Sequence, residues 1–242
     1  MRVEKYNYAS HGDGYCIAAA PPFRNRACWA ALSLGKNSMP KQIQRDHEIY
    51  IAPGILGLYE NDSPVAIDQL NDQNRLDPTN VDDKITIYER EVTGWFLEPA
   101  LKLLDEDSFQ NAFIVLMVCM SYLEGVEQYK TGIDSNRRSK DCFVESLERL
   151  YPDQFHKRDL EKLYSKSRCG LFHNGMVKGG VVFSSEYDNV MSFSNNAEII
   201  KINSRLLLNR IRQDFSSYIN ELRSEEQSET IRDNFNRIFS VL

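Results

Sequence analysis

The spacing of apolar residues divides the chain near residue 85. Before that point, glycine and proline recur every few residues from Gly12 to Pro78, which leaves room only for short strands or single helical turns. After it, apolar residues recur at intervals of three and four, the spacing of a helix with one buried face. We therefore expect an irregular N-terminal segment over residues 1–84 and a mainly α-helical bundle over residues 85–242.

The first 84 residues favour two short elements. Arg26 to Leu34 is the best helix candidate, and Glu48 to Ala52 is a strand candidate. Asn61 to Asn80 is polar and rich in Asp and Asn, a composition typical of an exposed loop or a linker.

The helical region begins with a stretch in which Pro99 predicts either a kink or a break. The later helices are expected at about Asp107 to Tyr129, Ser139 to Tyr151, His156 to Asn174, Arg205 to Arg223 and Glu226 to Phe239. The apolar stripe broadens around Ile114 to Cys119, so the helix that carries it is expected to be central. Asn203 or Ser204 is suited to cap the penultimate helix.

Three β-prone runs interrupt the helices: Val181 to Ser185, Val190 to Ser194 and Ile199 to Ile202. They are short and rich in β-branched and aromatic residues, which predicts a hairpin or a small meander inserted at about residues 180–202, before the penultimate helix.

Composition narrows the class of protein. The chain has 242 residues, 42% hydrophobic and 26% charged, which is ordinary for a globular protein. A net charge of −6 excludes a uniform basic coat for duplex DNA. Five cysteines without a CxxC pair, and histidines without metal-ligand spacing, predict reduced thiols, no metal and no cofactor. The sequence has no apolar run of signal-peptide or membrane-spanning length, so we expect a cytoplasmic protein that does not enter the membrane.

The helix predicted near residue 160 carries the candidate chemistry. Steps of four from Glu161 reach Ser165, Cys169 and His173, so one stripe combines a carboxylate, a hydroxyl, a thiol and an imidazole. Arg168 lies beside the stripe. The negative end of the helix dipole favours a protonated imidazole, which suits His173 to general acid–base catalysis. The planar donors of Arg168 suit phosphate oxygens.

These two groups predict RNA cleavage without a metal ion. His173 would remove a proton from a 2′-hydroxyl, which then attacks the adjacent phosphorus, and Arg168 would stabilise the developing charge. Residues 156–178 contain six basic and two acidic residues, a local balance of +4. Lys162, Lys166 and Lys178 are therefore expected to bind the RNA backbone, together with Asn174 by its position, unless these are simply solvated charges.

The run RCGLFH from Arg168 to His173 resembles the motif of the HEPN superfamily (higher eukaryotes and prokaryotes nucleotide-binding), in which Arg and His are separated by four residues. The resemblance extends over about residues 107–223. It implies a helical bundle and a metal-independent endoribonuclease with Arg168 and His173 as the catalytic pair. It also implies a homodimer, in which two motif helices face each other across one cleft that binds RNA or a nucleotide. The resemblance further implies a role in defence or stress response, for example as a component of a toxin–antitoxin system.

Several roles stay open. Cys169 is expected to pack rather than to act as a nucleophile that His173 activates, and Ser165 is a supporting residue of the stripe. Glu161 and Glu124 either orient the base or are solvated. Some members of the superfamily have no nuclease activity, so an inert module that binds a nucleotide or another protein is the alternative function.

Overall fold

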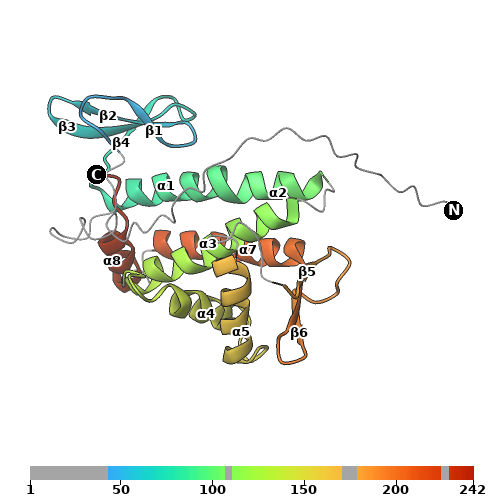
Figure 1. Ribbon diagram of the computed structural model, residues 1–242. Coiled ribbons are helices and arrows are strands. Elements are labelled where there is room, and N and C mark those ends of the chain that lie inside the picture. The colour runs from blue at the N-terminus through green and yellow to red at the C-terminus, as the bar shows by residue number, and fades with distance from the viewer. Residues whose placement is uncertain (1–42, 107–110, 171–178, 225–228) are drawn as a thin grey trace, which may run out of the picture. The chain divides into compact units, whose positions relative to one another are not determined.

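The computed structural model describes residues 43–106, 111–170, 179–224 and 229–242, and these residues form a mainly helical domain with two small sheets (Figure 1). The helices are α1 (Val81–Val92), the π-helical turn η1 (Thr93–Leu97), α2 (Glu98–Asp105), α3 (Asn111–Thr131), α4 (Ser139–Leu150), α5 (Lys157–Leu163), the π-helical turn η2 (Tyr164–Arg168), α7 (Ser204–Arg223) and α8 (Glu229–Ile238). The strands are β1 (Ile49–Ala52), β2 (Ile55–Glu60), β3 (Ser63–Asp68), β4 (Asn74–Leu76), β5 (Val181–Phe183), β6 (Met191–Ser194) and β7 (Ile199–Ile202). The predicted mainly α class is confirmed.

The prediction of an irregular segment over residues 1–84 is wrong for residues 49–76, which form an antiparallel sheet in the order β1-β2-β3-β4. Asn61 and Asp62 have φ values of 49° and 61°, as a two-residue hairpin turn requires, and Glu60 pairs with Ser63 across it. The Asn- and Asp-rich run from Asn61 to Asn80, predicted as a loop or linker, therefore contains strands β3 and β4 and the turns beside them, whereas the strand predicted for Glu48 to Ala52 is confirmed as β1. The helix predicted for Arg26 to Leu34 lies outside the described residues.

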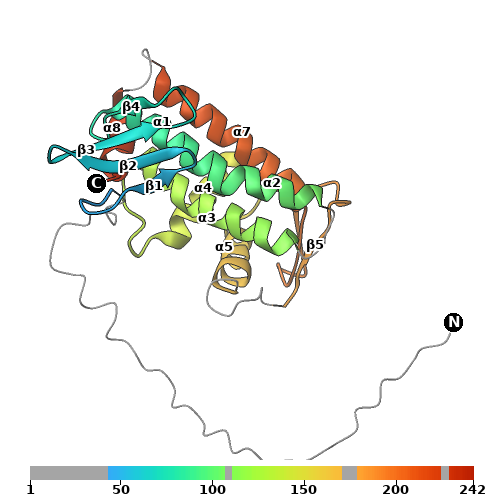
Figure 2. The ribbon, with the colours of Figure 1, turned by 90° about the horizontal axis from the view of Figure 1, so that it is seen from above.

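The first sheet packs on α1. Its strands contribute buried Ile51, Ile55 and Ala66 to the hydrophobic core. An ion pair of 3.0 Å between Arg90 Nη2 of α1 and Asp68 Oδ2 of β3 joins the two elements. Figure 2 shows the sheet seen over α1.

The first helical stretch is interrupted near the predicted position. Helix α1 begins at Val81, where the Asn80 side chain accepts hydrogen bonds from the backbone N–H groups of Asp82 and Asp83. The chain then passes through the π-helical turn η1, in which the N–H of Glu98 donates to the carbonyl of Thr93, and Pro99, which has no N–H to donate, follows directly in α2. The predicted break at Pro99 is thus confirmed, as a change of helical type.

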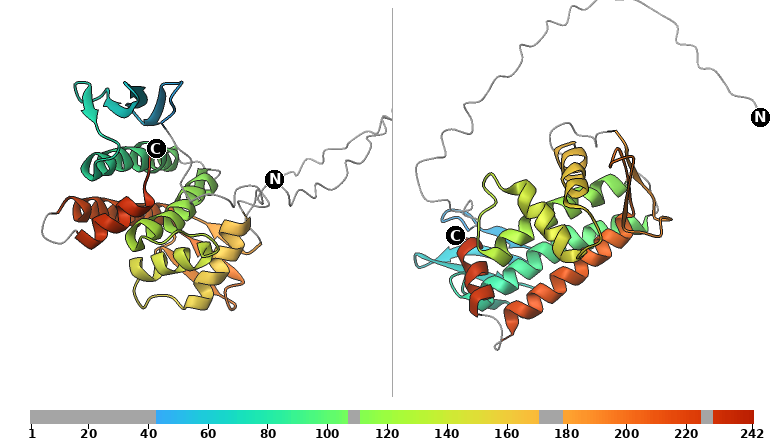
Figure 3. Two further views of the ribbon diagram at one scale, coloured as in Figure 1. Left: turned by 90° about the vertical axis from the view of Figure 1, so that its left-hand side faces the viewer. Right: turned by 90° about the horizontal axis from the view of Figure 1, so that it is seen from below.

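Helix α3 is the central element, as the apolar pattern predicted. Its buried residues include Leu116, Cys119, Met120 and Leu123, none of which is measurably exposed. It contacts α2, α4, α7, α8 and η2. Helix α7 runs beside α1 and α2 (Figure 3). Because neighbouring elements cover most of α3, its polar residues indicate which part of its surface is left open.

The second sheet has the three predicted strands but a different order. Strands β6 and β7 form a hairpin, whereas β5 pairs with β7 in parallel, which gives the order β5-β7-β6. The hairpin-or-meander prediction is therefore correct only for β6 and β7. Asn203 explains part of the arrangement: its side-chain amide donates to the carbonyls of Ser185 and Tyr187, and its side-chain oxygen caps α7 by accepting from the Leu206 N–H. Asn203 is thus the cap, one of the two predicted candidates.

Candidate functional site

The motif helix changes its winding before it reaches the motif. Helix α5 passes into the π-helical turn η2, and the N–H of Cys169 donates to the carbonyl of Tyr164, five residues earlier. A five-residue step breaks the predicted stripe of residues four apart. Ser165 is exposed and Cys169 is half-buried, while Glu161 pairs with Lys140 of α4 at 3.3 Å. The predicted single stripe is therefore wrong for its described members.

Arg168 lies against α3. Its Nε donates to Glu124 Oε2 at 2.9 Å and its Nη2 donates to Glu124 Oε1 at 3.3 Å, a two-point contact that fixes the plane of the guanidinium. Burial lowers the pKa of the Arg168 guanidinium, but the hydrogen bond and negative charge of Glu124 outweigh burial, and the net pKa is raised. The two side chains are 24% and 16% exposed, so the pair lies at the surface of the bundle and not in its interior.

Arg168 also lies near the ring of Tyr164, with 5.9 Å between the guanidinium carbon and the ring centroid. Burial raises the pKa of the Tyr164 phenol, although the charge of Arg168 lowers it. The phenol therefore stays protonated at neutral pH, with its ring near the guanidinium and its hydroxyl in contact with Ser139 of α4.

A pocket of about 180 Å³ opens where Arg168 meets α3, and it is lined by Ser121, Glu124, Gly125, Gln128 and Arg168. Apart from Arg168 these residues come from α3, at helical spacings of three and four. The pocket offers a guanidinium, a carboxylate, an amide and a hydroxyl at one surface hollow. That set of groups suits a small polar or charged part of a ligand.

A second pocket, of about 150 Å³, adjoins the first and shares Ser121 and Gly125 with it. Its other lining residues are mostly apolar or aromatic and come from α1, η1 and α3: Tyr88, Glu91, Val92, Phe96, Leu97, Val118, Tyr122, Val126 and Tyr129. We call the two adjoining pockets the α3 groove. One end of the α3 groove is charged and the other is largely apolar.

Two π-helical turns flank the α3 groove. Phe96 and Leu97 of η1 line its apolar end, and Arg168 of η2 lines its charged end. Single π-helical turns inside helices occur frequently at functional sites. We therefore take the α3 groove as the candidate functional site.

The sequence reasoning missed most of the α3 groove, although it carried a signal. Ser121, Glu124, Gly125 and Gln128 form a short stripe of small and polar residues on a helix that is otherwise strongly apolar. Such a stripe on a central helix indicates a surface left open by its neighbours. Glu124, which was considered only as a partner for a base, instead binds Arg168.

The structure assigns other partners to two lysines that were predicted to bind the RNA backbone. Lys166 Nζ donates to the carbonyls of Gly179 and Glu198 at 3.2 and 2.8 Å and to Glu198 Oε2 at 3.0 Å. Lys162 binds the carbonyl of Asn196 in the same hairpin turn. Both ammonium groups thus tie the motif helix to the β6–β7 turn, and they do not line the α3 groove.

Three of the predicted site residues, His173, Asn174 and Lys178, lie outside the described residues. In the described part of the chain, no group of three or more His, Cys, Asp or Glu residues could hold a metal ion. Among the same residues, no helix is both long enough and apolar enough to cross a bilayer.

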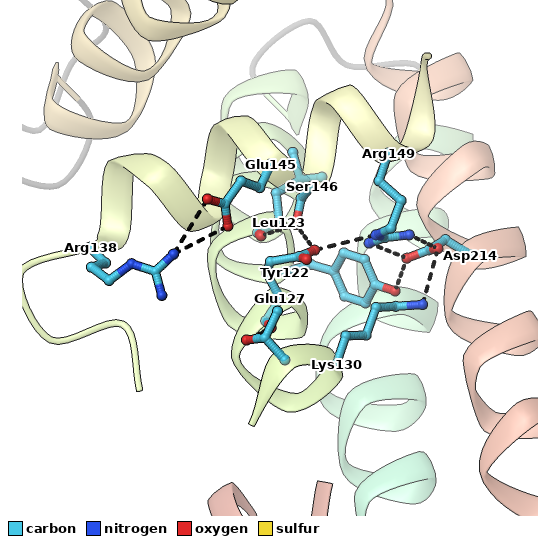
Figure 4. Close-up of polar contacts among 10 residues, drawn as sticks. Tyr122, Leu123, Glu127, Lys130, Arg138, Glu145, Ser146, Arg149 and Asp214 are labelled. Atoms are coloured by element: carbon cyan, nitrogen blue, oxygen red, sulfur yellow. Dashed lines mark hydrogen bonds and ion pairs between the residues drawn. The ribbon is translucent and has the colours of Figure 1, made fainter. Parts of the chain in front are cut away.

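A second charged group lies in the interior, where α3, α4 and α7 meet (Figure 4). Arg149 Nε donates to Glu127 Oε2 and its Nη2 donates to Asp214 Oδ2, both at 3.3 Å. The hydroxyl of Tyr122 donates to Asp214 Oδ2 at 2.8 Å, and Lys130 Nζ lies 3.7 Å from Asp214 Oδ1. Glu127 and Asp214 are only 8% and 9% exposed, whereas the Arg149 side chain is 31% exposed and reaches the surface. This interior cluster joins three helices, and we assign it a structural role.

Comparison of the chain with protein-family models, with curated proteins and with solved structures found no match. The function is therefore argued from the residues of the α3 groove and the motif helix.

Proposed function

We propose that this protein is a HEPN-type, metal-independent endoribonuclease with Arg168 and His173 as its catalytic pair. The observation that carries the proposal is the position of Arg168, at the charged end of the α3 groove and held there by Glu124. A guanidinium that is fixed before substrate arrives stabilises developing negative charge without reorganising during the reaction. The same side chain buried in the core would have argued against any contact with a phosphodiester.

The reaction follows from the two groups. His173 accepts the proton of a ribose 2′-hydroxyl, and the oxygen forms a bond to the adjacent phosphorus while the bond from phosphorus to the 5′-oxygen breaks. The leaving 5′-oxygen takes up a proton from the imidazolium or from water. The products are a 2′,3′-cyclic phosphate and a 5′-hydroxyl, and Arg168 offsets the charge on the phosphoryl oxygens. In this proposed reaction no metal ion takes part.

The expected active form is a homodimer through the motif helix, in which one protomer and its partner build a shared cleft for RNA. This follows from the motif resemblance. The exposed aromatic residues Trp95 and Phe96, 42% and 43% exposed, leave apolar surface beside the α3 groove. Such surface is available for contact with another molecule.

The alternative function is an inert module that binds a nucleotide or a protein. One observation favours it: the charge of Arg168 is already balanced by Glu124 at 2.9 Å, so an arriving phosphate meets a carboxylate as well as a guanidinium. In an enzyme the Arg168–Glu124 pair orients the guanidinium toward the substrate, whereas in an inert binding module it only connects η2 to α3.

The test is cleavage of mixed single-stranded RNA by the purified full chain in the presence of a chelator. We expect fragments that end in 2′,3′-cyclic phosphates, and loss of cleavage in both Arg168→Ala and His173→Ala. Arg223→Ala is the matched control, because Arg223 forms an exposed pair with Glu89 and does not line the α3 groove. No cleavage by the unsubstituted chain, or equal cleavage by all variants, contradicts the proposal.

A further inference from the structure

The apolar end of the α3 groove is lined mainly by apolar and aromatic residues, in contrast to the polar residues around Arg168. Phe96 contributes a ring that is 43% exposed, and Val92 and Val118 lie beside it in the lining. The half-buried ring of Tyr129 adds further aromatic surface, and the ring of Tyr88, only 4% exposed and 4.8 Å from it between centroids, supports it from the core. A flat aromatic ligand would find apolar contacts here that a phosphate would not.

Gly125 keeps the floor of the α3 groove open at the point where its two ends meet. A Cβ built at this position meets no heavy atom within 4 Å, so the glycine does not relieve a clash inside the protein. Glycine in the interior of a helix costs about 1 kcal/mol relative to alanine. The bare backbone at Gly125 allows another molecule to approach α3 closely, as glycines at ligand sites do.

We propose that the apolar end of the α3 groove is a base-binding subsite: it receives the nucleobase of a single-stranded nucleotide whose phosphate contacts Arg168. Arg168 and Phe96 stand at opposite ends of the lining, with Ser121 and Gly125 between them. This arrangement fits a ligand that is charged at one end and aromatic at the other. The proposal rests on the RNA substrate of the proposed function but not on the cleavage step.

The charges of the α3 groove select the orientation and the type of nucleic acid. Glu91 lines the apolar end, and its negative charge disfavours a phosphate there. Among the described residues that line the α3 groove, Arg168 is the basic one, so a phosphate is expected at its end. A base in a duplex is stacked and paired and cannot enter a pocket of this kind, whereas a base in a single-stranded loop or end can.

The test measures binding to an RNA that cannot be cleaved. The probe is a short, fluorescently labelled single-stranded oligonucleotide with 2′-O-methyl riboses, which blocks the attacking hydroxyl, and its counterpart is an abasic oligonucleotide of the same length. We expect the full chain to bind the base-bearing probe roughly tenfold more tightly than the abasic one in fluorescence anisotropy, in keeping with the usual contribution of one base–aromatic contact. Phe96→Ala and Gly125→Leu should each remove most of this difference, with the affinity for the abasic probe unchanged.

Two controls separate the subsite from a general change in the protein. Gly125→Ala adds a single methyl group and should reduce the preference less than Gly125→Leu, which fills the open floor. Ser216→Leu places the same side chain in a polar hollow on α7 and should change nothing.

The outcomes are distinguishable from those of the cleavage test. A preference for the base-bearing probe that Phe96→Ala and Gly125→Leu abolish supports the subsite, even where no RNA is cleaved and the enzymatic function fails. Equal affinity for both probes, or variants that bind like the parent, overturns the subsite even where RNA is cleaved. Conversion of a dimer into a monomer by Gly125→Leu, with unchanged affinity for the base-bearing probe, also overturns it and assigns the α3 groove to a second copy of the chain.

Discussion

Helix α3 contributes to two clusters in which an arginine from another helix meets a glutamate of α3, and the two clusters differ in almost every other respect. In the interior cluster, Arg149, whose side chain is 31% exposed, joins two buried carboxylates, those of Glu127 and Asp214. At the charged end of the α3 groove, Arg168 meets Glu124 with both side chains partly exposed. The residue types are the same, so the difference in role comes from their surroundings.

The comparison teaches how to separate a structural ion pair from a functional one on the same helix. Asp214 is held by Arg149, by the hydroxyl of Tyr122 and by Lys130, so its oxygens are bound within the protein. The three partners come from α3 and α4, so the contacts with Asp214 fix how α3, α4 and α7 pack. The Arg168–Glu124 pair borders an open pocket instead, where a ligand can reach it.

The largest expected effect is on stability, at the interior cluster. Arg149→Ala leaves Glu127 and Asp214 buried without their shared cation, and removal of one partner from a buried ion pair typically costs about 3–5 kcal/mol. Urea unfolding followed by circular dichroism measures the loss. Arg223→Ala removes an exposed pair and should cost no more than about 1 kcal/mol. If both variants unfold at the same urea concentration, the structural role assigned to the interior cluster is wrong.

The second effect, on activity, is expected at the other cluster. Arg168→Gln should lower RNA cleavage roughly 10²- to 10³-fold, as loss of one charge-stabilising donor does, while the free energy of unfolding falls less than in Arg149→Ala, because one partly exposed carboxylate loses its cation in place of two buried ones. Glu124→Gln should lower cleavage less, because the guanidinium stays in place but is held by a weaker acceptor. Single-turnover cleavage rates and urea midpoints on the same preparations make the comparison. A large loss of stability in Arg168→Gln would place this pair with the interior cluster.

A third, smaller effect is a pH dependence of stability that arises from Asp214 of the interior cluster. Burial raises the pKa of Asp214, but the hydrogen bond and charge of Arg149 outweigh it, and the net pKa is lowered from its ordinary value of 3.8. A carboxyl group with a lowered pKa in the folded state stabilises the protein above its unfolded-state pKa, and this contribution is lost as the pH falls through the folded-state pKa.

The free energy of unfolding of the parent should therefore exceed that of Asp214→Asn by a constant amount above about pH 5, and the difference should shrink below about pH 4. Urea titrations at several pH values measure it. A difference that grows toward low pH would contradict the lowered pKa.

The sequence predicted the helices more successfully than the sheets, for physical reasons. The apolar spacing of α3 and α4 is local information, and their bounds agree with the prediction within a few residues. The first sheet depends on pairing between strands, and the polar residues of its turns, such as Asn61 and Asp62, were interpreted as a loop. Strand β5 pairs with β7 in parallel, and the spacing of apolar residues marks each strand without saying which strand it pairs with.

The candidate site shows the same division. Arg168 stood out because a short motif marked it, but its partner Glu124 lies 44 positions away and only the fold brings the two together. Lys162 and Lys166 were predicted to meet RNA because of local charge, and tertiary hydrogen bonds to the β6–β7 turn decided otherwise. The π-helical turn η2 also has no signature in the apolar spacing, so a stripe drawn in steps of four failed within it.

The smallest expected effect is a gain in stability at the surface of α3. Gly125 lies inside a helix, has no positive φ among the described residues, and has open space where a Cβ would stand. Gly125→Ala should therefore raise the free energy of unfolding by about 0.5–1 kcal/mol, because alanine loses less backbone freedom on folding. Urea unfolding measures the gain, and an unchanged or lower stability would contradict the open geometry. A gain would mean that α3 carries a residue that is unfavourable for folding on the side that faces the groove. Such a residue is expected where one side of a helix contacts a ligand and the other side packs against the protein.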